Sequence, residues 1–116
     1  MISAALIATS LLLSVQGGMQ ILAGPQRQQL SRCLRAFVDS KIAERMAGDA
    51  FDTALGGACA EQETAYRAAY VAAAVRAGDS RTAAERDAGL EVSDLRENYK
   101  GLFHGAMDPS RSAAAQ

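Results

Sequence analysis

Two cysteines, Cys33 and Cys59, constrain the fold of this 116-residue chain more than any other feature. They are its only cysteines, and a small protein in an oxidising compartment usually pairs two such residues. A disulfide that closes a loop of about 25 residues contributes about 3–3.5 kcal/mol to the free energy of unfolding in the chain-entropy model. The alternative, which applies if the chain is not exported, is a pair of reduced cysteines that pack as small apolar side chains.

The composition favours helices and excludes one class of partner. Apolar residues make up 49% of the chain, but aromatic residues only 5%, and much of the apolar share is alanine. Because alanine is the best helix former and lets helices approach closely, we expect an all-α bundle. The net charge of −1 arises from interspersed signs without a basic block, so nucleic acid is not an expected partner.

The first 23 residues carry no charge and are typical of an export signal. Residues 4–15 form an apolar run of signal-peptide length, and small residues at positions 17 and 23 are candidate cleavage sites, of which we favour Ala23. Two features are atypical, because no basic residue precedes the run and neither site is Ala-x-Ala. The alternative is an uncleaved membrane anchor, for which the segment is just long enough.

The first helix of the mature domain is predicted over residues 25–48. Pro25 suits its first turn, Arg45 suits its last turn and Gly48 is the expected stop. Apolar side chains recur at three- and four-residue spacing, with Cys33 on the same stripe. The other members of this stripe are Leu30, Leu34, Phe37, Val38, Ile42 and Met46.

Two further long helices are predicted, over residues 58–77 with Gly78 as the stop, and from a capping box at Thr82-Ala83-Ala84-Glu85 onward. The residues expected on their inner faces are Cys59, Tyr66, Tyr70, Ala73 and Ala77, and then Ala84, Ala88, Val92, Leu95, Tyr99 and Leu102 or Phe103. Residues 24–104 are thus expected to form one helical domain, and residues 105–116 a frayed, disordered tail.

The disulfide predicts how these helices connect. Cys33 lies about 21 Å before the end of the first helix, whereas Cys59 opens the next long helix. The sulfur atoms can therefore meet only if the segment between them runs back along the first helix. We expect Asp49 to cap a short helix over residues 50–55, ended by Gly56-Gly57, which buries Phe51 and Leu55 against residues 37–42.

Residues that could carry chemistry are few. His104 is the only histidine, near the expected tail, and we predict that it is dispensable. C-x-x-C, C-x-x-C-H and G-x-S-x-G motifs are absent, and two cysteines with one histidine do not supply four zinc ligands. We therefore expect no catalytic residue, metal or cofactor. The acidic pairs, which have basic neighbours typical of a solvated surface, are Asp39 and Glu44, Glu61 and Glu63, Glu85 and Asp87, and Asp94 and Glu97.

The arrangement of leader, cysteine on an amphipathic helix, second cysteine after Gly56-Gly57 and a helix start at Ser80-Arg81 resembles small exported helical proteins of bacteria with one disulfide. The resemblance covers residues 30–103 and implies no particular activity. In broad architecture the chain is also similar to the single-disulfide periplasmic acid-stress chaperones, although its cysteine spacing differs from theirs.

Two functional hypotheses follow. The first is a non-enzymatic, periplasmic or secreted protein that binds another envelope protein, as a stress chaperone, an inhibitor or an accessory subunit. The alternative is a small hydrolase or ligand carrier that uses the scattered acids and His104. Contact with a membrane is expected only through residues 1–23, if that segment is retained.

Overall fold

The computed structural model describes residues 23–114, with side chains up to residue 111, and this part of the chain is all-α as predicted. It contains the helices α1 (Gly24–Ala43), α2 (Gly48–Gly57), α3 (Ala60–Arg76), α4 (Arg81–Met107) and α5 (Pro109–Ala114). Residues 1–22, which are all but the last residue of the predicted leader over residues 1–23, and residues 115–116 lie outside the described residues. None of the described helices is long and apolar enough to cross a membrane.

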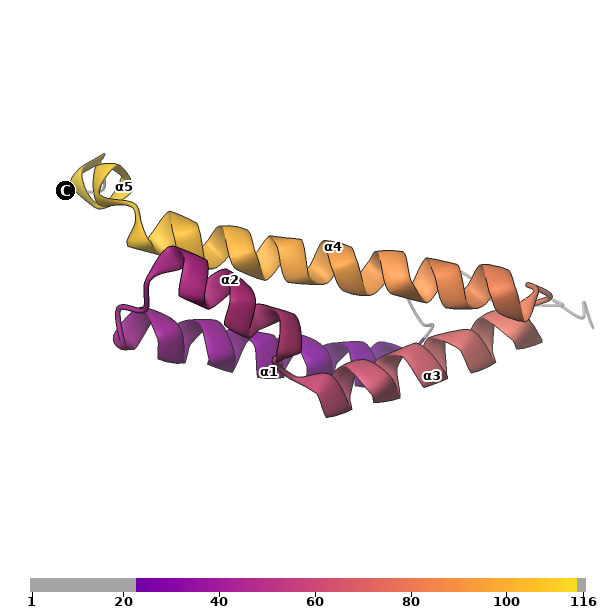
Figure 1. Ribbon diagram of the computed structural model, residues 1–116. Helices are drawn as coiled ribbons and strands as arrows, with labels where there is room; N and C mark the ends of the chain where they lie inside the picture. Colours follow the sequence, from indigo (N-terminus) through magenta and orange to yellow (C-terminus); the bar gives the residue numbers. More distant parts are fainter. Residues whose placement is uncertain (1–22, 115–116) are drawn as a thin grey trace, which may run out of the picture.

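The helices form a three-helix bundle in which α2 and α3 together take the place of the second helix (Figure 1). We call this segment, residues 48–76, the middle arm, and the chain breaks it between α2 and α3. α1 and α4 run in the same direction, and α2 followed by α3 runs back between their ends. α3 packs against both α1 and α4, while α2 continues the same arm toward the other end of the molecule. The predicted reversal of the chain between the first helix and Cys59 is therefore confirmed.

The disulfide forms between Cys33, in the middle of α1, and Cys59, at the break between α2 and α3, with the two Cα atoms 6.0 Å apart. This distance is typical of a disulfide. Cys59 has a positive φ of 62°, so the chain changes direction at the cross-linked residue itself. The covalent bond thus fixes the turn of the middle arm to the centre of α1.

The core follows the predicted helical stripes closely. On α1 the buried residues are Leu30, Leu34 and Val38, with Phe37, Ile42 and Met46 partly buried around them. On α4 Phe103 is buried, whereas Leu102 is 43% exposed. On α3 Tyr66 and Tyr70 are buried as predicted, but Val71 and Ala74 replace Ala73 and Ala77, because α3 must face α4 as well as α1.

The predicted packing of the short helix is partly wrong. Phe51 and Leu55 are buried, but α2 packs chiefly against α4. The ring of Phe51 stacks on Phe103 of α4 with centroids 3.8 Å apart, and the ring of Phe37 on α1 is 5.7 Å away. The side chains of Phe51 and Phe103 are both fully buried, so their contact removes a large apolar area from water and holds α2 against α4.

The ends of α1 and α2 also differ from the prediction. α1 stops at Ala43 rather than Gly48, because Arg45 adopts the left-handed conformation usually taken by glycine (φ 52°). The amide of Met46 then donates to the Lys41 carbonyl at 3.1 Å and closes the helix end. α2 begins at Gly48 with Ala47 as its N-cap, so Asp49 is not the cap.

The start and the end of α4 also differ from the prediction. Its N-cap is Ser80, whose Oγ accepts from the Ala83 amide at 3.1 Å, so the helix begins before the predicted capping box at Thr82. α4 then continues through Gly101 and Gly105 to Met107, and α5 follows, where a disordered tail was expected. Each helical glycine costs about 1 kcal/mol, which the burial of Phe103 offsets.

Candidate functional site

The break in the middle arm is held by Arg96 of α4 as well as by the disulfide from α1. The Arg96 guanidinium donates to the carbonyl of Leu55 at 2.7 Å and to the carbonyl of Ala58 at 2.9 Å, and so caps the last turn of α2. Its Nε and Nη2 also bind one carboxylate oxygen of Glu63, in the first turns of α3, at 3.0 and 2.8 Å. One side chain therefore joins the end of α2 to the start of α3.

This arginine was missed in the sequence, although a signal was present. Arg96 lies four residues after Val92 and three before Tyr99, on the apolar side of α4. A charged side chain at such a position is stable only if it forms hydrogen bonds or ion pairs there. Its side chain is only 15% exposed and that of Glu63 is 25% exposed. The pair is thus shielded from water far more than the ion pairs on the outer surface.

These contacts lower the pKa of Glu63. Burial alone would raise it, but the hydrogen bonds from Arg96 and Arg67 outweigh the burial, and the pKa lies below its usual value. A carboxyl group whose pKa is lower in the folded than in the unfolded chain stabilises the fold above its unfolded pKa. This contribution is lost as the pH falls through the folded value.

We therefore expect Glu63→Gln to flatten the dependence of stability on pH. The wild type should lose free energy of unfolding between about pH 5 and pH 3 more steeply than the variant, as measured by urea titration at each pH. Asp94→Asn, at an exposed position outside the cluster, is the matched control and should keep the wild-type slope. Equal slopes for Glu63→Gln and the wild type would contradict this assignment.

His104 is not isolated, contrary to what its position in the sequence suggested. Its Nε2 lies 2.7 Å from Oδ1 of Asp52, so the pair links the last turn of α4 to α2. The histidine and aspartate side chains are 43% and 37% exposed, and a surface pair of this kind contributes little to stability. The structure shows a contact between two helices, and the dispensability of His104 stays a prediction.

The other predicted acids do not converge on one point. Most pair with basic neighbours on the same helix: Asp39 with Arg35, Glu44 with Lys41, Glu85 with Arg81, and Asp87 with Arg86. Within the described residues, no group of three or more acids, cysteines or histidines is placed to hold a metal ion. These pairs have the character of a solvated surface.

The outward side of α3 is a surface without charged side chains over most of its length. We define the α3 outer face as five exposed residues that lie opposite the core side of the helix: Thr64, Ala65, Ala68, Ala72 and Val75. None is charged, and Val75 is 43% exposed. The hydroxyl of Thr64 donates to the carbonyl of Ala60 in its own helix at 3.0 Å, so it offers no free hydrogen to this face.

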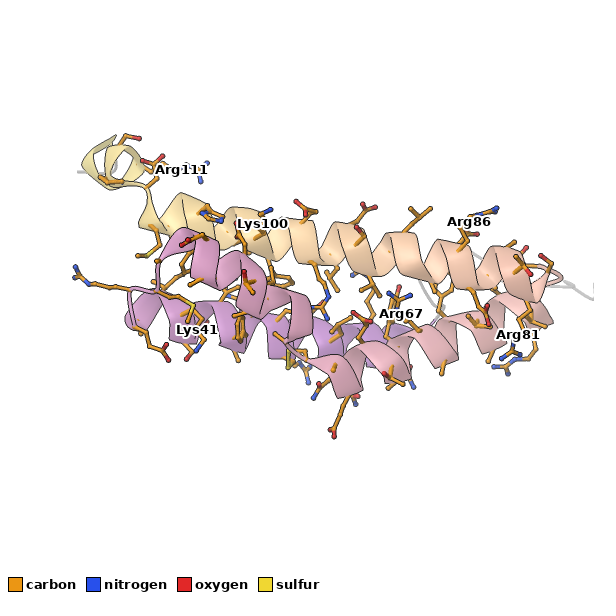
Figure 2. All side chains as sticks on the ribbon, viewed as in Figure 1. Lys41, Arg67, Arg81, Arg86, Lys100 and Arg111 are labelled. Carbon is orange, nitrogen blue, oxygen red and sulfur yellow. A yellow bond between two sulfur atoms is a disulfide. The ribbon has the colours of Figure 1, made fainter. Side chains whose placement is uncertain are left out.

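The α3 outer face borders a groove of about 540 Å³ between α3 and α4. Ala68, Val71, Ala72 and Val75 give the groove its apolar part, and Arg67, Arg81 and Glu85 its charged part. Figure 2 shows Arg67 between the two helices and Arg81 near the turn that joins them. A second hollow of about 450 Å³ lies at the start of α3, along Ala60, Glu61 and Thr64.

Comparison of the chain with protein-family models, with curated proteins and with solved structures gives no match.

Proposed function

We propose that this protein is an exported, non-enzymatic protein of the bacterial envelope that binds a partner protein through the α3 outer face. The observation that carries the proposal is that the five exposed residues of the α3 outer face carry no charge and four of them are apolar. The outward side of a surface helix normally carries charged and polar residues, and α1 and α4 cover only the inner side of α3. Exposed apolar patches of this kind mark interaction surfaces.

The small side chains of the α3 outer face indicate which kind of surface the partner presents to it. Alanine side chains let the backbone of a second helix approach closely, whereas they offer little apolar area to a flat surface. The hollows at the start of α3 and beside α4 lie along the same side of the molecule and leave room for a helix to approach. The partner is accordingly an envelope protein that places an α-helix along α3.

The anchored break of the middle arm supports this function. The disulfide from α1 and Arg96 from α4 hold the first turn of α3 from two sides. A helix held in this way presents its outer face without reorganisation, which lowers the entropic cost of binding. The disulfide itself supports export, because disulfides persist in oxidising compartments.

The test is site-specific photo-crosslinking in cells of the organism that makes the protein. A benzophenone amino acid replaces Ala68 on the α3 outer face or, as the matched control, Leu90 on the outward side of α4, which is 59% exposed. We expect a discrete protein adduct from position 68 and none from position 90. Absence of an adduct at position 68, or equal adducts at both, would contradict the proposal.

A further inference from the structure

We infer that the partner of the α3 outer face is a second copy of this chain, bound with the two α3 helices antiparallel across a two-fold axis. This inference rests on the proposed function and names the partner that the same surface receives. It depends on the order of residues along α3, on the charges at the two ends of the face, and on the size of its side chains.

The charges at the two ends of the face are opposite. Glu61 lies exposed at the start of α3 and Arg76 lies exposed at its end, about 22 Å apart along the helix axis. Among the salt bridges of the described residues none involves Glu61 or Arg76, and the Arg76 Nε donates back to the carbonyl of Ala72 at 3.2 Å. Both charges are therefore available to a partner.

A two-fold axis that passes between residues 68 and 69 brings the α3 outer faces of two copies together. In that register Glu61 of one copy lies opposite Arg76 of the other, and the same pair forms again at the other end. Ala65 then faces Ala72, and Ala68 lies at the centre. The uncharged outer face of one helix thus meets the same face of the other, and the exposed Glu61 and Arg76 at its ends pair with each other.

A membrane surface fits this face less well than a helix. Helices that lie on membranes insert large apolar or aromatic side chains and surround them with lysine and arginine. The α3 outer face has three alanines, one threonine and one valine, and the residue that flanks its start, Glu61, is acidic. Alanine-lined helices gain from close helix–helix packing, which a second α3 supplies.

The first experiment is sedimentation velocity of the full-length chain over a range of micromolar concentrations. We expect the wild type to dimerise, Ala68→Glu to sediment as a monomer, and Leu90→Glu, the matched control on α4, to dimerise like the wild type. Circular dichroism of each variant confirms that the fold is retained. A monomeric wild type, or dimerisation unchanged by Ala68→Glu, overturns the inference.

A charge exchange tests the antiparallel register. Glu61→Arg and Arg76→Glu should each weaken the dimer about 10-fold, because each puts like charges together at both ends of the interface. The double variant restores opposite charges, and its dissociation constant should return to within about threefold of the wild-type value. Failure of the double variant to recover overturns the register and the inference with it.

The crosslinking experiment separates this inference from the proposed function. An adduct from position 68 with twice the mass of the chain supports both. An adduct with a different envelope protein, together with a monomeric wild type, leaves the proposed function standing and overturns the inference. Binding of the monomer to anionic lipid vesicles that Ala68→Glu abolishes also overturns it.

Discussion

Replacing Cys33 or Cys59 by serine is expected to lower the free energy of unfolding by about 2–5 kcal/mol. The loop that the disulfide closes spans 26 positions and includes the whole of α2, so its loss frees the middle arm at its break. For a domain of this size the melting temperature should fall by more than about 10 °C. Thermal unfolding followed by circular dichroism measures the change.

A reducing agent provides the matched control for this prediction. It should lower the melting temperature of the wild type to near that of the Cys33→Ser/Cys59→Ser double variant, and it should leave the double variant unchanged. Equal melting temperatures of wild type and double variant under oxidising conditions would show that the cross-link does not stabilise the fold.

Replacing Arg96 by methionine is expected to lower the free energy of unfolding by about 2–4 kcal/mol. The apolar stem is kept, but the carbonyls of Leu55 and Ala58 lose their donor and Glu63 loses its most shielded partner. Arg96→Lys should fall between the wild type and the methionine variant, because an ammonium group does not reproduce the planar set of donors. Chemical denaturation of the three proteins gives the comparison.

Arg35→Met is the matched control for Arg96. Arg35 pairs with Asp39 on the surface of α1, where both side chains are more than 60% exposed, and its loss should cost less than about 1 kcal/mol. If the two methionine variants lost similar stability, the proposed role of Arg96 at the break would be wrong.

The topology could be predicted from the sequence because the apolar residues recur at clear helical spacing and the Cys33–Cys59 disulfide limits how the helices can connect. Leu30, Leu34 and Val38 recur at helical spacing and are buried. The separation of Cys33 from the end of its helix left one route for the chain, back along α1. Gly78 ends α3 with a φ of 109°, as a glycine at this position is expected to do.

Other features could not be predicted because they depend on contacts between distant residues. α1 ends where Arg45 adopts the left-handed conformation, which is normally taken by glycine and was therefore expected at Gly48. The extension of α4 past Gly101 depends on the stacking of Phe103 on Phe51, and the His104–Asp52 pair spans 52 positions. The α3 outer face could not be predicted because alanine fits both the core and the surface of a helix, so its exposure depends on which side of α3 the other helices cover.

The central claim, that a protein covers the α3 outer face, is tested most directly by carbene footprinting in intact cells. Trypsin releases residues 68–76, which contain most of the face, and residues 87–96, which contain the exposed Leu90 of α4. The account predicts that the peptide from α3 is labelled several-fold less in cells than in dilute purified protein, whereas labelling of the α4 peptide is unchanged. Equal labelling of the α3 peptide in both conditions would contradict it.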